Sequence, residues 1–98
     1  MTPNGSEQAT MREAILLWGE TSQMLMAVEE CAELQQSLLH VLRGRHAWRD
    51  VARELADVEI MCAQLRLMMP PSVDVDEEVA RKMERLRFRV SSAKGLST

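Results

Sequence analysis

Five carboxylate residues occur in two short strings whose spacing is suited to binding a cation. Glu29, Glu30 and Glu33 form an E-E-x-x-E string, and Glu54 and Asp57 form an E-x-x-D string after an interval of about twenty residues. On a helix, residues three or four positions apart share a face, so each string can direct two carboxylates to one point. Like charges that close together repel each other unless a cation lies between them. Ligation by oxygen alone favours Mg²⁺ or Mn²⁺, which in turn bind phosphate oxygens.

The composition indicates an all-α protein without a general affinity for nucleic acid. Met, Leu, Ala, Glu and Arg dominate the 98 residues, and the aromatic residues are restricted to Trp18, Trp48 and Phe88. This composition is typical of helices. The net charge of −3 gives no reason to expect a nucleic acid partner.

The cysteines and the apolar runs indicate the compartment. Cys31 and Cys62 have neither C-x-x-C spacing nor paired histidines for zinc, so we interpret them as buried free thiols in a reducing cytosol. No apolar run has the length of a membrane span. The N-terminus also lacks the basic segment followed by an apolar one that marks a secretory signal. We therefore expect a cytoplasmic protein that does not bind a membrane.

Capping and breaking residues divide the chain into four helices. Gly19 and Gly44 are suited to end the first two helices, and Pro70 ends the third. Asp74 and Glu77 form a D-x-x-E capping box for the fourth helix. The expected helices cover residues 7–18, Thr21 or Ser22 to about Arg43, about residue 50 to Met69, and about residue 75 to Val90, between loose tails at about residues 1–6 and 91–98.

These helices are expected to form one domain, residues 1–98. Because short connections join long helices, we predict an antiparallel four-helix bundle-type protomer. A domain of this size buries a modest share of its surface, and the third helix carries a second apolar face formed by Ala56, Ile60 and Leu67. Both features indicate a homo-oligomer, either a homodimer or a homotetramer.

The third helix carries a carboxylate on its main apolar side. With residues placed about 100° apart around the helix axis, the apolar stripe consists of Ala47, Val51, Val58, Met61, Leu65 and Met69. Glu54 falls near the middle of this stripe and Asp57 at its edge. Burial of an uncompensated carboxylate costs several kcal/mol, so we expect Glu54 to have a positive partner or a cation.

The second helix gives a weaker pattern. Glu29 and Glu33 share a sector with Gln36, whereas Glu30 borders the apolar side beside Leu34. We therefore predict that Glu30 is the inward-facing member of the adjacent pair. For a lone E-E-x-x-E string, a solvated charged face would be the simplest interpretation.

The two strings together favour a metal site over a solvated face. Two antiparallel helices with acids near their apolar stripes would bring four carboxylates together across one contact. A di-iron site of the ferritin type would need Glu-x-x-His pairs, which neither His40 nor His46 provides.

The acid strings resemble the motif of the MazG-type all-α nucleoside triphosphate pyrophosphohydrolases. That superfamily also includes dimeric dUTPases and phosphoribosyl-ATP pyrophosphohydrolase. The resemblance extends to Trp18-Gly19, to E-L-A-D-V-E-I-M at residues 54–61 and to K-M-E-R-L-R-F-R at residues 82–89. The resemblance covers roughly residues 15–90, and these segments look like those of the short, single-domain members of the family.

The resemblance implies a Mg²⁺-dependent hydrolase that removes surplus or non-canonical nucleotides. Such an enzyme cleaves a nucleoside triphosphate between its α and β phosphates and releases a nucleoside monophosphate and pyrophosphate. The metal ligands would be Glu30, Glu33, Glu54 and Asp57, with Mn²⁺ as the alternative ion. Glu29 would be an auxiliary acid, and either Glu29 or Glu33 would position or deprotonate the attacking water.

Substrate binding has weaker candidates. Lys82, Arg85 and Arg89 lie on one face of the fourth helix and resemble the family's phosphate-binding residues, although a solvated basic face would look the same. Trp18 is either a stacking surface for the base or an anchor in a core or interface. Gln23 is either a hydrogen-bonding partner of the base or sugar or an exposed residue of the first helical turn.

Two alternatives remain from the sequence. In one, the chain is a non-catalytic helical interaction module whose acids at residues 29–33 pair with the arginines of residues 43–53 or with a basic partner. In the other, the fold is the same but the substrate is dUTP or phosphoribosyl-ATP.

Overall fold

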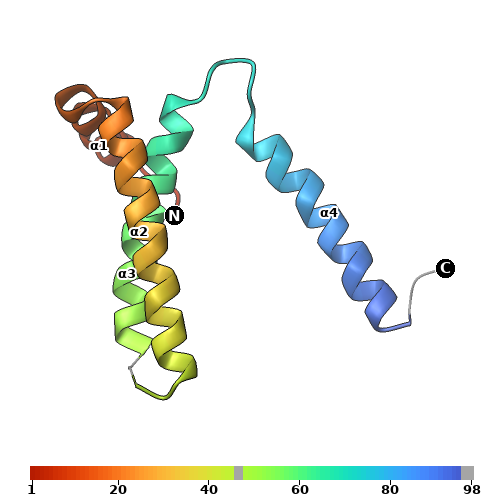
Figure 1. Cartoon of the computed structure of the whole chain (residues 1–98). Coiled ribbons are helices and arrows are strands. Elements are labelled where there is room, and N and C mark those ends of the chain that lie inside the picture. The colour runs from red at the N-terminus through yellow and green to blue at the C-terminus, as the bar shows by residue number, and fades with distance from the viewer. Residues whose placement is uncertain (46–47, 96–98) are drawn as a thin grey trace. The chain divides into compact units, whose positions relative to one another are not determined.

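The structure, a computed structural model, describes residues 1–45 and 48–95. These residues form four α-helices and no strand, so the all-α prediction is confirmed (Figure 1). The helices are α1 (Gly5–Trp18), α2 (Glu20–Leu42), α3 (Trp48–Met68) and α4 (Val75–Ala93). His46 and Ala47, as well as the end of the predicted C-terminal tail, lie outside the described residues.

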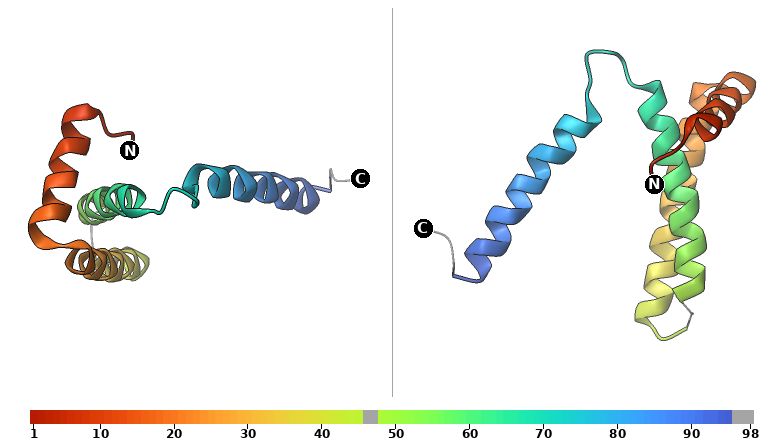
Figure 2. Two further views of the ribbon diagram at one scale, coloured as in Figure 1. Left: turned by 90° about the horizontal axis from the view of Figure 1, so that it is seen from above. Right: turned by 180° about the vertical axis from the view of Figure 1, so that it is seen from behind.

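The chain divides into two compact units. Residues 1–68 contain α1, α2 and α3, and residues 69–98 contain α4. In the first unit, α2 and α3 run antiparallel and side by side, and α1 contacts both of them (Figures 1 and 2). The predicted antiparallel pairing of the two acid-bearing helices is therefore present within this unit.

The first helix begins earlier than the sequence signals indicated. Asn4 Oδ1 accepts a hydrogen bond from the Glu7 backbone N–H at 2.8 Å, and Glu7 Oε1 accepts one from the Asn4 N–H at 2.9 Å. This capping box starts α1 at Gly5. The Met1 amino group also forms an ion pair with Glu59 Oε1 on α3 at 3.0 Å. Of the tail predicted over residues 1–6, residues 5 and 6 instead belong to α1, and residues 1–4 precede the helix.

The start of α2 also differs from the prediction. Thr21 and Ser22 do not cap this helix, because they lie inside it and no side chain caps its first turn. Gly19 has φ 91°, a conformation that favours glycine. It joins α1 to α2 without a loop, so α2 begins at Glu20. At the other end, Gly44 follows the helix with φ 71°, as predicted.

The fourth helix has half of its predicted capping box. Asp74 Oδ1 accepts a hydrogen bond from the Glu77 N–H at 3.2 Å. The Glu77 carboxylate forms an ion pair with Arg81, also at 3.2 Å. The helix continues past Val90, because residues 91–93 keep helical geometry, and it ends at Ala93.

The core of the first unit is small and lies between its helices. Val51 and Met61 are buried, and Val58 and Leu65 are half-buried, so this part of the predicted stripe faces inward. Met69 is exposed, in contrast to the prediction, because it follows the last residue of α3. The remaining buried apolar residues are Met11, Ala27 and Ala63.

A buried hydrogen bond joins α2 to α3 within this core. Gln23 Nε2 donates to Gln64 Oε1 at 2.7 Å, and both residues are 5% exposed. Because each amide would be unpaired in any other alignment of the two helices, this bond favours one register.

We expect Gln64→Leu to lower the free energy of unfolding by about 1–3 kcal/mol, since the buried Gln23 amide would lose its partner. The double variant Gln23→Leu, Gln64→Leu should recover part of this loss, because neither helix then buries an unpaired amide. Urea unfolding followed by circular dichroism measures both effects. As a control, Gln36→Leu on the exposed side of α2 should change stability by less than about 0.5 kcal/mol. Equal losses for Gln64→Leu and Gln36→Leu would contradict the structural role of the pair.

Candidate functional site

Three of the predicted metal ligands come together between the two antiparallel helices. Glu30 and Glu33 lie one turn apart on α2, and Glu54 lies on α3. Each offers one carboxylate oxygen, and these three oxygens lie within 4.8 Å of one another. We call Glu30, Glu33 and Glu54 the acid cluster.

The acid cluster buries two carboxylate oxygens without a hydrogen-bond partner. Glu30 and Glu54 are half-buried, whereas Glu33 is exposed. Oε2 of Glu30 and Oε2 of Glu54 are shielded from solvent and accept no hydrogen bond within the described residues. An unpaired buried carboxylate oxygen is costly, and a cation would remove this cost. A set of hard oxygen donors fits Mg²⁺ or Mn²⁺.

The electrostatics of the acid cluster are those of a site that lacks a counter-charge. Burial raises the pKa of Glu30, and the negative charges of Glu33, Asp57 and Glu54 raise it further. Burial also raises the pKa of Glu54, followed by the effects of Glu33, Asp57 and Asp50. The ionised cluster is therefore unfavourable in the folded chain unless a positive charge is added.

The other two predicted acids lie outside the cluster. Asp57 is exposed, yet its charge contributes to the raised pKa of both Glu30 and Glu54. Glu29 is exposed, whereas Glu30 is half-buried, so the prediction that Glu30 is the inward-facing member of the pair is confirmed.

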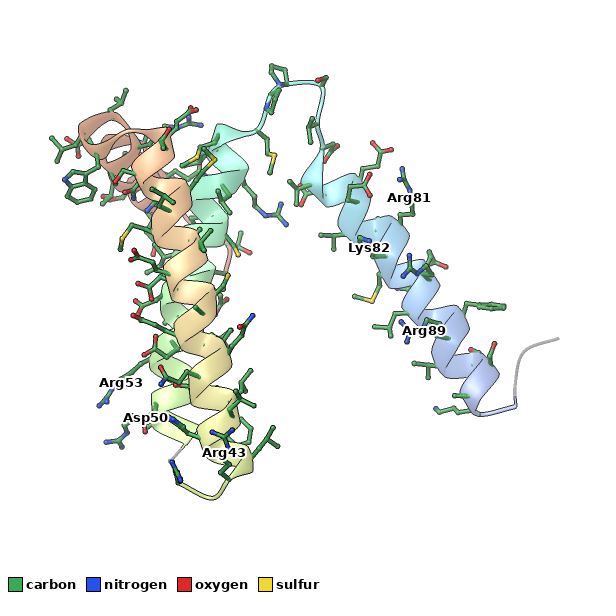
Figure 3. The ribbon with its side chains drawn as sticks, in the orientation of Figure 1. Arg43, Asp50, Arg53, Arg81, Lys82 and Arg89 are labelled. Carbon is green, nitrogen blue, oxygen red and sulfur yellow. The ribbon has the colours of Figure 1, made fainter. Side chains whose placement is uncertain are left out.

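Asp50 was missed in the sequence reasoning. Its charge contributes to the raised pKa of Glu54, and its Oδ1 lies 3.5 Å from Arg53 Nη1 (Figure 3). The signal was available, because Asp50 precedes Glu54 by four residues and so lies one helical turn away on the same face.

The arginines near the acid cluster do not neutralise it. Within the described part of the chain, no ion pair joins Glu30, Glu33 or Glu54 to a basic residue, and Arg53 instead pairs with Asp50. The interaction-module alternative, with residues 29–33 pairing to residues 43–53, therefore has no ion pair to support it in this protomer.

The predicted phosphate-binding residues lie on α4, which is described by itself. Lys82, Arg85 and Arg89 are exposed, and the ion pairs of this helix instead use Arg81 with Glu77 and Glu78 (Figure 3). Arg87 likewise pairs with Glu84. The hydrogen bonds and ion pairs of the described residues do not involve Lys82, Arg85 or Arg89, so these three charges are available to an anionic ligand.

The two candidates for base recognition differ in accessibility. Trp18 is 62% exposed at the end of α1 and can present its ring to a ligand. Gln23 is buried, and its amide is bonded to Gln64, so it is not an exposed residue of the first turn.

The cysteine interpretation needs a correction. Both thiols are free, but Cys31 and Cys62 are exposed rather than buried. Each cysteine therefore lies on a side of its helix that no described helix of the first unit covers, even though Met61 and Ala63, which flank Cys62, are buried.

Comparisons with protein-family models, curated protein sequences and solved structures gave no match to this chain. The family resemblance therefore rests on the motif residues and stays a prediction. None of the described helices has both the length and the apolar character needed to span a bilayer.

The raised pKa values of Glu30 and Glu54 predict the pH dependence of the metal-free protein. A folded state that holds a proton more tightly than the unfolded chain becomes less stable as that proton is lost. The contribution of the acid cluster to the free energy of unfolding should therefore decrease as the pH rises from about 4.5 towards neutrality.

The measurement is a series of urea unfolding curves across this pH range for the wild type and Glu54→Gln. The variant should lose less stability with rising pH, because one unfavourable ionisation is absent. Glu13→Gln, a change at an exposed acid of α1, should follow the wild type. Parallel curves for Glu54→Gln and the wild type would show that the cluster imposes no such cost.

Proposed function

We propose that this chain is a Mg²⁺-dependent nucleoside triphosphate pyrophosphohydrolase. The observation that carries the proposal is the pair of shielded, unpartnered oxygens, Glu30 Oε2 and Glu54 Oε2, within a cluster of three carboxylates. A merely solvated acidic face would leave both oxygens in water. The motif resemblance then favours a nucleotide over other ligands of a divalent cation.

In this proposal Glu30, Glu33 and Glu54 hold the cation, and the nearby Asp57 completes the ligand set. Mg²⁺, or Mn²⁺ in its place, would supply positive charge to the phosphate oxygens as negative charge builds on them. Glu30 and Glu54 are fixed by helices that pack against each other, which keeps their carboxylates in place before any ligand arrives.

The exposed residues have the remaining roles. The carboxylate of Glu33, at the solvent side of the cluster, orients the attacking water or accepts its proton, with Glu29 as the auxiliary acid. Lys82, Arg85 and Arg89 bind the phosphate tail through charge-assisted hydrogen bonds. Trp18 can stack on the base, whereas Gln23 could contact a base or sugar only after leaving Gln64.

We also propose that the working form is a homodimer or homotetramer. The core of the first unit is small, and none of the large side chains among the described residues is fully buried. A unit with so little buried surface has more to gain from association than from its own packing.

We expect Mn²⁺ or Mg²⁺ to bind the wild-type chain in isothermal titration calorimetry and to raise its unfolding temperature. Glu54→Gln keeps the size of the side chain but removes one ligand charge, so affinity should fall about tenfold or more. Glu13→Gln should bind like the wild type. Equal affinities for all three proteins would place the ion elsewhere and contradict the assignment.

Catalysis is tested by pyrophosphate release from a panel of ribo- and deoxyribonucleoside triphosphates that includes dUTP, with phosphoribosyl-ATP assayed in parallel. We expect release that depends on Mg²⁺ and falls about a hundredfold or more in Glu54→Gln, since charge stabilisation in the transition state is lost. The preferred substrate also separates the general enzyme from the dUTP and phosphoribosyl-ATP alternatives. If every substrate stays intact with either ion, the hydrolase proposal is wrong.

A further inference from the structure

One side of α2 is apolar, uncharged and open to solvent. By helical phase it lies away from both α3 and the acids Glu29 and Glu33. Its single polar member is Gln35. We call this side the outer face of α2; it comprises Met24, Leu25, Val28, Cys31, Ala32, Gln35, Leu38, Leu39 and Leu42.

The outer face is exposed over its full length, from Met24 to the end of α2 at Leu42. Val28 is 67% exposed, and Leu42, at the end of the helix, is 81% exposed. Every other member of the face is exposed as well. A surface helix of a self-sufficient domain would carry polar residues on a side that faces water.

The outer face is large enough for a stable contact between proteins. Its exposed large apolar side chains present on the order of 700 Å², which approaches the roughly 800 Å² that each partner buries in a specific interface. Monomeric proteins rarely expose a continuous apolar patch of this extent. Such a surface therefore indicates a partner.

The spacing within the outer face indicates that the partner is a helix. Leu25, Val28, Ala32, Gln35, Leu39 and Leu42 alternate steps of three and four residues. This is the spacing of a seam at which two helices pack knobs into holes. The small side chain of Ala32, near the middle of the seam, allows the two helix axes to approach closely.

The outer face also matches itself. In a two-fold dimer the same patch supplies both sides of the contact, so the patch must be complementary to itself, and a face without charge buries no unpaired charge there. The outer face contains no charged residue. The apolar stripe of α4, by contrast, has Lys82 and Arg89 on one flank and Arg87 on the other, and burial against an uncharged face would desolvate them.

We propose that the outer face of α2 is the contact surface between two copies of this chain, related by a two-fold axis. The inference names the surface for the self-association suggested above and rests on that part of the proposed function. Because the acids project from a different side of α2, the acid clusters of both copies stay open to ligands in the dimer.

The test is the mass of the full chain by size-exclusion chromatography with light scattering, without metal or nucleotide. We expect the wild type to be a dimer or a multiple of it, and Val28→Glu to raise the dissociation constant about a hundredfold or more. Gln36→Glu adds the same charge to an exposed position of α2 outside the outer face, and it should keep the wild-type mass. Equal masses for wild type and Val28→Glu would overturn the proposal.

A second measurement distinguishes dissociation of the dimer from unfolding of the variant. In a Cys62→Ser background, Cys31 should react slowly with a maleimide in the dimer and at least about tenfold faster in Val28→Glu, while circular dichroism shows retained helix. A monomeric wild type with a protected Cys31 would place another part of the same chain on this face, and it would also overturn the proposal. Because no assay here involves metal or hydrolysis, its failure leaves the catalytic proposal unaffected.

Discussion

The first unit depends on placing carboxylates in the contact between α2 and α3. Glu30 and Glu54 are half-buried, near the sides of the helices that also supply much of the core. Their shielded oxygens lack partners, and their neighbours are acids. The contact therefore combines hydrophobic packing, which holds the helices together, with a charge repulsion that opposes it.

Other contacts of the first unit stabilise the packing of α2 on α3 against the repulsion between the carboxylates. The Gln23–Gln64 bond fixes the alignment of α2 and α3 away from the acids, and α1 contacts both helices near that bond. The Met1–Glu59 ion pair also joins the N-terminus to α3. A site held by rigid helices keeps its ligands in position at a cost in stability, which is the usual relation between function and stability at binding sites.

The sequence was most informative where a charged residue occurs among apolar ones. Glu54 stood out because an acid interrupts an apolar stripe, and Glu30 because it borders one. The local cap at Asp74 was also readable. The Gln23–Gln64 pair was not, because it joins positions 41 residues apart, and local patterns carry no information on such partners. The exposed cysteines were missed because apolar neighbours were taken to mean burial, which holds only if another helix covers that side.

The packing of a single protomer accounts for only part of the residue pattern of α2. One side packs on α3, a second carries Glu29 and Glu33, and the third is apolar yet exposed from Met24 to Leu42. Selection for the packing of this protomer alone would leave the third side free to become polar. An uncharged third side is instead what a surface needs if a second helix is to lie against it. The ligand binding and the association proposed above would use different sides of one helix, so each could change without altering the other.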